Sequence, residues 1–234
     1  MPPEANTDSS YLSKRAQLAT YFDETASKTW ERLTSDAPVS RIRETVRQGR
    51  EQMAGVLLGI LPKDMKGMRI LDAGCGAGPL SIKMAERGAD VIAVDISASL
   101  VDVAERRTPA HLKHQITYKV GDMLTAVTGQ VDAIIAMDSL IHYDAEDIAK
   151  SLERLARNCR GAIAFTIAPK TLPLTAMHLA GKAFPKSDRS PAIIPVSPKH
   201  LTRVAEARLN GRHLWTHERI ASGFYISQAM EVCP

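Results

Sequence analysis

The chain has 234 residues, of which 44% are hydrophobic, and carries a formal net charge of +4 with a pI near 9.0. These values fit one α/β domain with a sizeable core, and the positive charge suits an anionic partner such as nucleic acid, a membrane surface or a small polycarboxylate. No apolar run approaches the roughly 20 residues that cross a bilayer, and the start MPPEANTDSS is too polar for a signal peptide, so we expect neither a membrane-spanning nor a secreted protein.

The three cysteines, Cys75, Cys159 and Cys233, are isolated from one another. They form no CxxC pair and no Cys/His spacing suited to zinc. We therefore expect a cytoplasmic protein without disulfides and without a protein-bound metal.

The first quarter of the chain precedes any strand signal. Residues 1–10 have the composition of a flexible tail, and residues 11–61 have the apolar spacing of helices, with a break at 36–38 where Asp and Pro mark a turn. We predict an N-terminal helical cap over 11–61, followed by a core over 62–234.

Strand and helix patterns then alternate along the core. Strands are predicted at 68–73, 89–95, 116–122, 131–138 and 161–169, with helices at 79–87, 97–107 and 145–158 between them. This alternation is typical of a doubly wound, Rossmann-like parallel sheet.

The last quarter of the chain changes in composition. Residues 171–198, after the fifth strand, are rich in proline and basic residues, which indicates an insertion that acts as a lid. A helix at 199–208 and two β-like runs at 217–223 and 224–230, forming a terminal hairpin, complete the prediction.

A glycine-rich turn, LDAGCGAGPLSI, follows the first strand, with Gly74, Gly76 and Gly78 in G-x-G-x-G spacing. Glycines there allow positive φ and close approach of a ligand, while the next helix offers free N–H groups to an anion. Pro79 departs from the dinucleotide fingerprint, which disfavours NAD, and the phosphate-binding G-x-x-x-x-G-K-[ST] motif is absent.

Two aspartates follow the next strands. Asp95 ends the second strand, where a carboxylate accepts both ribose hydroxyls of a bound nucleoside; the alternative is that it caps the helix starting near Ser97. Asp122, after the third strand, has two open interpretations as well: a contact with the exocyclic amine of adenine, or a turn aspartate.

The segments ILDAGCGAG, AVDIS and GDM, in this order, resemble the class I S-adenosylmethionine-dependent methyltransferases over roughly residues 68–168. The resemblance implies a seven-stranded sheet with one antiparallel strand near its end, S-adenosylmethionine as cofactor and S-adenosylhomocysteine as product. The implied cofactor-binding residues are Asp72, Gly74, Cys75, Gly76, Gly78, Asp95, Ile96, Asp122, Met123 and Asp138.

The segment after the fourth strand bears on the methyl acceptor. Nucleic-acid amino-methyltransferases usually carry Asn/Asp-Pro-Pro-Tyr/Phe there, whereas this chain has DSLIHY at 138–143. Aromatic residues make up 5% of the chain, so stacking platforms are scarce. We therefore expect no nucleic-acid partner.

A narrower resemblance extends over nearly the whole chain. YFDETASKTWERL at 21–33, VRQGREQM at 46–53, LDAGCGAGPLSIKMAERGA at 71–89, DSLIHY, FTIAPKT at 165–171 and FYIS at 224–227 are similar to the magnesium protoporphyrin IX methyltransferases of chlorophyll and bacteriochlorophyll synthesis. That family esterifies one propionate of its substrate, which brings its own magnesium. The resemblance also suggests the large porphyrin-binding subunit of magnesium chelatase as partner and peripheral contact with a photosynthetic membrane.

The implied catalytic residues are His142 and Tyr21. His142 can orient the propionate or remove its proton, or it can be a structural histidine satisfied by a loop carbonyl; Tyr21 can reach the site from the cap or pack between helices. The predicted binding residues for the second propionate are Lys170, Lys182, Lys186 and Arg189. Arg47 and Arg50 can bind a carboxylate or lie on a solvated helix face.

Two other functions stay open from the residues alone. One is methylation of another hydrophobic acid or a quinone, and the other is a non-catalytic carrier of the porphyrin or the cofactor. The sequence does not choose between the two propionates and gives no oligomeric state.

Overall fold

A computed structural model describes residues 7–26, 41–171 and 192–234 of the chain. The turn predicted at 36–38 and most of the lid predicted at 171–198 lie outside these residues. The remaining predictions can be compared with the structure element by element.

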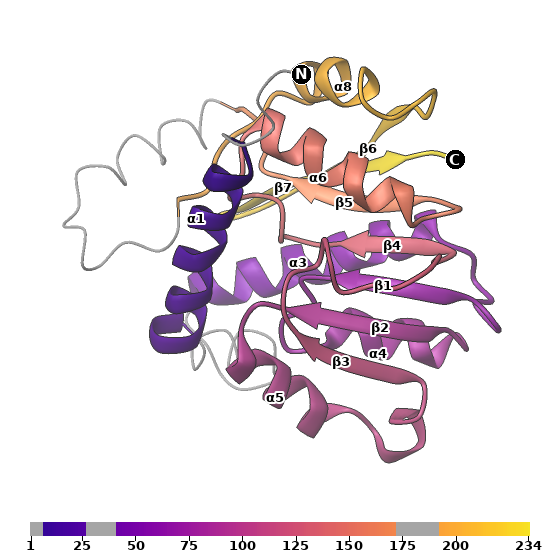
Figure 1. Cartoon of the computed structure of the whole chain (residues 1–234). Helices are drawn as coiled ribbons and strands as arrows, with labels where there is room; N and C mark the ends of the chain where they lie inside the picture. The colour runs from indigo at the N-terminus through magenta and orange to yellow at the C-terminus, as the bar shows by residue number, and fades with distance from the viewer. Residues whose placement is uncertain (1–6, 27–40, 172–191) are drawn as a thin grey trace.

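Within the described residues, seven strands form one sheet in the order β3-β2-β1-β4-β5-β7-β6 (Figure 1). The strands are β1 (Arg69–Ala73), β2 (Asp90–Asp95), β3 (Ile116–Val120), β4 (Ala133–Ala136), β5 (Ile163–Ile167), β6 (Leu214–Ser222) and β7 (Tyr225–Val232). The first five pair in parallel, and β7 runs antiparallel to both of its neighbours, β5 and β6. The predicted doubly wound sheet with one antiparallel strand is confirmed.

Helices cover both faces of the sheet and one of its edges. They are α1 (Thr7–Thr20), the π-helix η2 (Tyr21–Ala26), α3 (Arg41–Ile60), α4 (Pro79–Glu86), α5 (Ala98–Arg107), the short 3-10 helix η3 (Ala110–Leu112), α6 (Ala145–Arg157) and α8 (Pro198–Glu206). Helices α3 and α4 pack on one face and α6 and α8 on the other, while α5 packs against β2 and β3. Figure 1 shows α1 lying across the carboxyl ends of the parallel strands, the edge where open α/β sheets bind ligands.

Two boundaries differ from the sequence predictions by three residues or more. Helix α1 begins at Thr7, inside the predicted flexible tail, and the Ser10 hydroxyl donates to the Asp147 carboxylate at 3.1 and 3.2 Å. Strand β6 begins at Leu214, three residues before the predicted run. Residues 215–219 are all exposed, so this edge strand lacks the alternating pattern that would have revealed its start.

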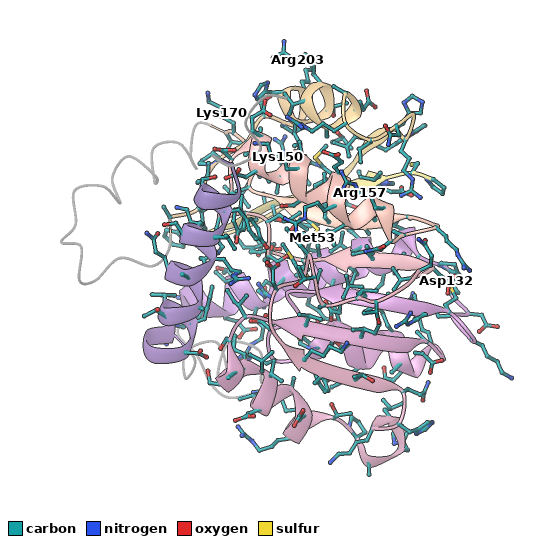
Figure 2. All side chains as sticks on the ribbon, viewed as in Figure 1. Met53, Asp132, Lys150, Arg157, Lys170 and Arg203 are labelled. Atoms are coloured by element: carbon teal, nitrogen blue, oxygen red, sulfur yellow. The ribbon has the colours of Figure 1, made fainter. Side chains whose placement is uncertain are left out.

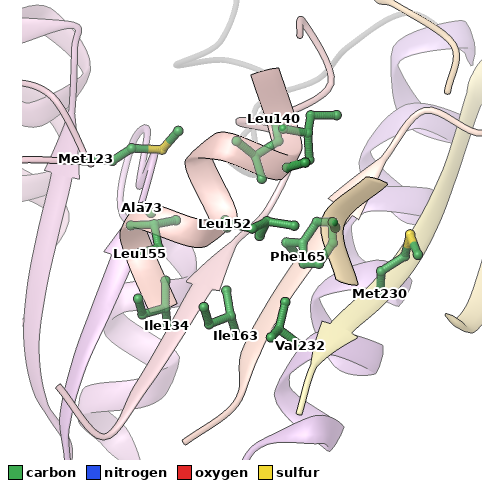
Figure 3. Packing of buried hydrophobic residues seen from close by; sticks show 14 of the residues in the cluster. Ala73, Met123, Ile134, Leu140, Leu152, Leu155, Ile163, Phe165, Met230 and Val232 are labelled. Carbon is green, nitrogen blue, oxygen red and sulfur yellow. The ribbon is translucent and has the colours of Figure 1, made fainter. Parts of the chain in front are cut away.

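The hydrophobic core forms two layers, one on each face of the sheet. The layer under α6 and α8 contains Phe165, which is fully buried on β5 (Figure 3). The other members of this layer labelled in the figure are Ala73, Met123, Ile134, Leu140, Leu152, Leu155, Ile163, Met230 and Val232. Burying each large apolar side chain contributes roughly 1.5–3 kcal/mol, so this layer holds the sheet rigid beneath the loops at its edge.

Asp144→Ala is expected to lower the free energy of unfolding by about 1 kcal/mol, because Asp144 is the N-cap of α6 and accepts the backbone N–H of Asp147 at 2.9 Å. Urea unfolding measures the change. Ser197→Ala is the matched control: Ser197 is the N-cap of α8 but makes no side-chain capping bond, so its stability should stay within about 0.5 kcal/mol. Equal losses in both variants would contradict the capping role of Asp144.

Candidate active site

The turn between β1 and α4 is built on three glycines with positive φ: 86° at Gly74, 53° at Gly76 and 82° at Gly78. A Cβ on Gly74 would collide with Ser139, and one on Gly78 would lie 2.7 Å from the Tyr118 hydroxyl. A Cβ on Gly76 would meet nothing within 4 Å. The outer glycines therefore allow close packing, whereas the space beside Gly76 is open.

Asp95, at the carboxyl end of β2, holds this turn in place. One carboxylate oxygen accepts the N–H of Gly76 at 2.8 Å, and the other accepts the N–H of Ser97 at 2.9 Å. Burial raises the pKa of Asp95, and these two backbone hydrogen bonds oppose the rise. Helix α5 is capped by Ser97 itself, whose hydroxyl accepts the N–H of Leu100. A carboxylate has about four acceptor positions, so that of Asp95 retains unused acceptor capacity.

Asp72, on β1, is fully buried beneath the turn. The Ser81 hydroxyl on α4 donates to its carboxylate at 2.6 Å. Burial raises the pKa of Asp72 to about 7, the bond from Ser81 lowers it, and the charge of Asp95 raises it further. Asp72 therefore braces β1 against α4 directly below the predicted ligand.

The other predicted cofactor residues surround the same edge. Cys75 is buried, and burial raises the pKa of its thiol well above the usual value. Ile96 is half-buried and packs on the core, and Met123 is almost fully buried in it. All three lie at the carboxyl ends of β1 to β3, where the sequence places them.

Asp122, in the loop after β3, is fastened to the cap helix α1. Its carboxylate accepts the Tyr11 hydroxyl at 2.8 Å and the Leu124 N–H at 2.9 Å, and it forms an ion pair with Arg15 at 2.9 Å. A carboxylate offers about four acceptor positions, and three of them are used here. The partners of Asp122 on α1 could not be read from the local sequence.

The cap closes over the edge through three more contacts. The Tyr11 ring stacks on that of Tyr143, with centroids 5.1 Å apart and planes inclined by 22°. Asp23, in η2, accepts the hydroxyls of Ser97 at 2.7 Å and Ser99 at 3.1 Å at the start of α5. Residues from the first 26 positions thus enclose the carboxyl edge of the sheet.

His142 lies under this cap and is buried. Its Nδ1 is 3.3 Å from the carbonyl oxygen of Ala192, and its ring meets that of Phe22 edge-on, with centroids 6.1 Å apart. Burial lowers the pKa of His142; the Ala192 bond and Asp138 raise it, and Lys14 lowers it. Because a carbonyl only accepts, Nδ1 carries the proton and Nε2 keeps a lone pair in the neutral ring.

The structure is compatible with both interpretations of His142, the structural one and the catalytic one. A loop carbonyl satisfies Nδ1, and Nε2 can still interact with a ligand. Tyr21 is half-buried, and its ring meets Phe22 with centroids 5.4 Å apart. Among the described residues, Phe22 rather than Tyr21 makes the ring contact with His142. A catalytic Tyr21 therefore stays a prediction.

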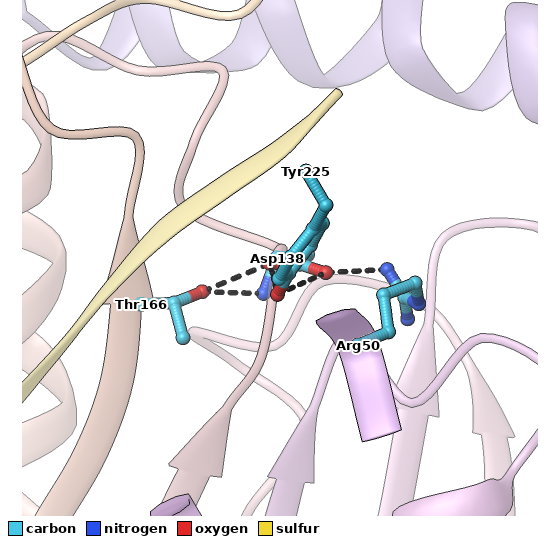
Figure 4. Close-up of polar contacts among 4 residues, drawn as sticks. All are labelled: Arg50, Asp138, Thr166 and Tyr225. Atoms are coloured by element: carbon cyan, nitrogen blue, oxygen red, sulfur yellow. Dashed lines mark hydrogen bonds and ion pairs between the residues drawn. The ribbon is translucent and has the colours of Figure 1, made fainter. Parts of the chain in front are cut away.

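Asp138, which precedes this loop, sits in a cluster of four side chains (Figure 4). Its carboxylate pairs with Arg50 on α3, accepts the Tyr225 hydroxyl at 3.1 Å, and accepts the Thr166 hydroxyl at 3.2 Å. Its φ is 56°, a left-handed conformation that costs a non-glycine residue about 1–3 kcal/mol. The resemblance implies a cofactor contact for Asp138, and the sequence did not indicate Thr166 and Tyr225 as its partners.

Of the four basic residues predicted to bind the second propionate, the structure describes Lys170. Lys170 is exposed (Figure 2), and its N–H donates to the carbonyl of Val196 at 2.9 Å. The other three, Lys182, Lys186 and Arg189, lie outside the described residues. A cation that sequence reasoning passed over is Lys14, which shares the inner face of α1 with buried Tyr11 and Leu18 and acts on His142.

One further atom suits a ligand at this edge. The Ser139 hydroxyl is buried and has no hydrogen-bond partner among the described residues, and it lies beside Gly74. Together with the open space at Gly76 and the acceptor capacity of Asp95, it fits a ligand that bears both a polar group and ribose hydroxyls.

The described residues contain neither a cluster suited to a metal ion nor a membrane-spanning helix. No group of three or more His, Cys, Asp or Glu side chains there is arranged to hold a metal ion. No helix there is long and apolar enough to cross a membrane.

Comparisons with known proteins identify similar chains. Residues 136–234 match the family described as "Magnesium-protoporphyrin IX methyltransferase C-terminus", and residues 70–161 match "Methyltransferase domain". The chain is 46% identical to the magnesium-protoporphyrin O-methyltransferase of Rhodobacter capsulatus over 97% of its own length and 99% of that protein. It is 33% identical to the protein of the same name from Synechocystis sp. PCC 6803, covering 74% and 77% of the two chains.

A solved structure gives the same result for the fold. The crystal structure of the magnesium protoporphyrin IX methyltransferase from Synechocystis PCC 6803 with bound S-adenosylhomocysteine matches with a TM-score of 0.81 and 27% identity. The match covers 94% of this chain and 99% of that one.

Proposed function

The chain belongs to the magnesium-protoporphyrin O-methyltransferase family, and from this we propose that it transfers the methyl group of S-adenosylmethionine to one propionate carboxylate of magnesium protoporphyrin IX. The products are the monomethyl ester and S-adenosylhomocysteine. The near-complete match to the Rhodobacter capsulatus enzyme is the observation that carries this conclusion.

We place the cofactor on the turn at 74–78, with its ribose hydroxyls on Asp95 and its amino-acid part near Asp72 and Ser139. The open space at Gly76 and the unpartnered Ser139 hydroxyl support this placement. Adenine would lie by Met123, with its amine on the acceptor position of Asp122 that the cap leaves unused. When bound, S-adenosylmethionine supplies an electrophilic methyl group on a sulfonium.

The remaining chemistry is chiefly placement. A propionic acid has a pKa of about 4 to 5 and is ionised at neutral pH, so no strong base is needed. The protein must exclude water and bring the carboxylate within about 3 Å of the methyl carbon. Lys14, on the inner face of the cap, offers the positive charge for that carboxylate.

His142 completes this proposal as the acceptor of any proton that the acid form brings. Its Nδ1–H is aligned with the Ala192 carbonyl, which leaves the Nε2 lone pair for the substrate. The Tyr21 hydroxyl is a second donor to the propionate in this scheme. Residues 11–61 serve as the cap in this scheme. The second propionate is bound by Lys170 and by three residues of the lid at 171–198: Lys182, Lys186 and Arg189.

The substrate is hydrophobic and anionic, which bears on its delivery. We propose that the large porphyrin-binding subunit of magnesium chelatase hands it over, and that this cytoplasmic protein contacts the photosynthetic membrane peripherally. The net charge of +4 supports attraction to anionic surfaces.

Purified protein incubated with magnesium protoporphyrin IX and S-adenosylmethionine is expected to add one methyl group to the porphyrin, as seen by mass spectrometry. Parallel reactions each offer one alternative acceptor, either metal-free coproporphyrin or a catechol-type quinol. Methylation of the quinol alone would move the assignment to another acceptor. Binding of both ligands without any transfer would favour a carrier.

A further inference from the structure

The cluster around Asp138 joins four segments that are far apart in the sequence. Arg50 comes from α3, Thr166 from β5 and Tyr225 from the start of β7 (Figure 4). Two glycines make this meeting possible. A Cβ on Gly49 would lie 2.6 Å from the Tyr225 ring, and one on Gly223 would collide with Thr45, so α3 and the β6–β7 hairpin pack closely only with glycine at both positions.

The charges in the cluster are balanced inside the protein. The side chain of Asp138 is 7% exposed and that of Arg50 is 19% exposed, so the pair is largely removed from water. Burial and the neighbouring Asp138 both raise the pKa of Tyr225, which keeps its phenol protonated as a donor. Arg50, Tyr225 and Thr166 thus direct three donors at one carboxylate, and a buried carboxylate requires such partners.

The backbone of Asp138 is held by the same cluster. Its N–H donates to the Thr166 hydroxyl at 2.8 Å, and that hydroxyl donates back to the Asp138 carboxylate at 3.2 Å. Main chain and side chain are therefore fixed together while φ is 56°. The only other non-glycine residue with positive φ in the described residues is Asn210, after α8.

The direction of the chain after residue 138 decides where two site residues lie. Ser139 follows immediately and packs on Gly74. His142 follows further along the same loop, and its Nδ1 lies at the Ala192 carbonyl. If residue 138 relaxed to an ordinary φ, both side chains would leave these positions.

We infer that Arg50, Thr166 and Tyr225 are positioning residues: they hold Asp138 in the left-handed conformation that directs Ser139 toward the cofactor turn and His142 toward the acceptor. This inference rests on the proposed function for the meaning of the two directed residues. It assigns the Asp138 carboxylate an internal role instead of the cofactor contact expected from sequence.

Two double variants separate conformation from charge. Arg50→Met/Asp138→Gly and Arg50→Met/Asp138→Ala both remove the whole ion pair between these two residues. Glycine adopts positive φ without strain and alanine does not. We call the double variant with Asp138→Ala the alanine pair and the one with Asp138→Gly the glycine pair. The alanine pair is expected to have a kcat for magnesium protoporphyrin IX about 30-fold below that of the wild type. The kcat of the glycine pair should be at least about fivefold higher than that of the alanine pair.

Calorimetric titration with S-adenosylhomocysteine gives a second readout that needs no methyl acceptor. The alanine pair should bind it more weakly than the glycine pair, because Ser139 faces the cofactor turn. Circular dichroism at the assay temperature checks that both pairs are folded. Arg203→Met, an exposed arginine-to-methionine change on α8 (Figure 2), should leave turnover and affinity unchanged.

Equal kcat and equal affinity in the two pairs would overturn the inference. If both were strongly impaired, the carboxylate itself would be the functional group; if both matched the wild type, the cluster would have no role in positioning. A wild type that binds S-adenosylhomocysteine but methylates no porphyrin would remove the proposed function, and the affinity ratio of the two pairs would still decide the inference.

Discussion

His142→Ala is expected to lower kcat for methylation of magnesium protoporphyrin IX by about 10- to 100-fold, chiefly through poorer placement of the propionate, because most of the substrate is already ionised at neutral pH. The affinity for S-adenosylhomocysteine should change by less than about threefold, since the predicted cofactor turn lies between β1 and α4, in another part of the chain. Assays quenched at fixed times, with the cofactor and the porphyrin both saturating, measure kcat. Calorimetry measures the affinity for S-adenosylhomocysteine. A loss of kcat below about threefold would mean that the histidine is structural.

The pH dependence gives an independent check on His142. A base must be neutral, and burial lowers the pKa of His142 from its usual value of 6.5. As pH falls, kcat should therefore stay constant through about 6.5 and decline only below it. In His142→Ala the decline should begin only at about pH 5, where the propionate itself becomes protonated, whereas His200→Ala, an exposed change on α8, should keep the wild-type profile. A decline that begins above about pH 7 in the wild type would contradict the assignment.

Gly76→Leu is expected to weaken binding of S-adenosylhomocysteine by at least about 100-fold, because its side chain would fill the open space at the turn where we place the cofactor. Isothermal titration gives the dissociation constant directly. The fold should survive, since a Cβ at this position meets no protein atom within 4 Å.

Gly67→Leu provides a closely matched control. Gly67 has a φ of 75° and also has nothing within 4 Å of its Cβ position, but it lies in the turn before β1, at the opposite edge of the sheet. Both variants therefore carry the same kind of backbone strain, and Gly67→Leu should bind the ligand normally. Equal weakening in the two variants would attribute the effect to strain rather than to a blocked site.

The fold could be predicted where the sequence carries a local signal. Buried parallel strands such as Ile163–Ile167 appear as continuous apolar runs, and α6 has its acidic first turn and basic last turn. The start of β6 could not be predicted because an exposed edge strand has no alternation to detect. The start of α1 was missed because its anchor, Asp147, is 137 residues away from Ser10.

The candidate site divides in the same way. The glycine turn and Asp95 follow the neighbouring strands β1 and β2, so the order of the motifs could place them together, and the Gly76 N–H does donate to the Asp95 carboxylate. The partners of Asp138 depend on the topology of the whole sheet: Arg50 is 88 residues before it and Tyr225 is 87 after it. No local pattern connects such positions, so the sequence indicated which residues are polar but not which would meet.

The place of β7 in the sheet has a consequence for biosynthesis. This strand is translated after the other six, yet it lies between β5 and β6 and delivers Tyr225 to Asp138. A nascent chain on the ribosome can form the β1–β5 layer and its glycine turn, but the loop with His142 lacks one of its restraints until β7 has left the exit tunnel. Completion of the cluster around Asp138 therefore waits for translation of the hairpin, and a polypeptide released before Tyr225 lacks the hydrogen bond from its hydroxyl to Asp138.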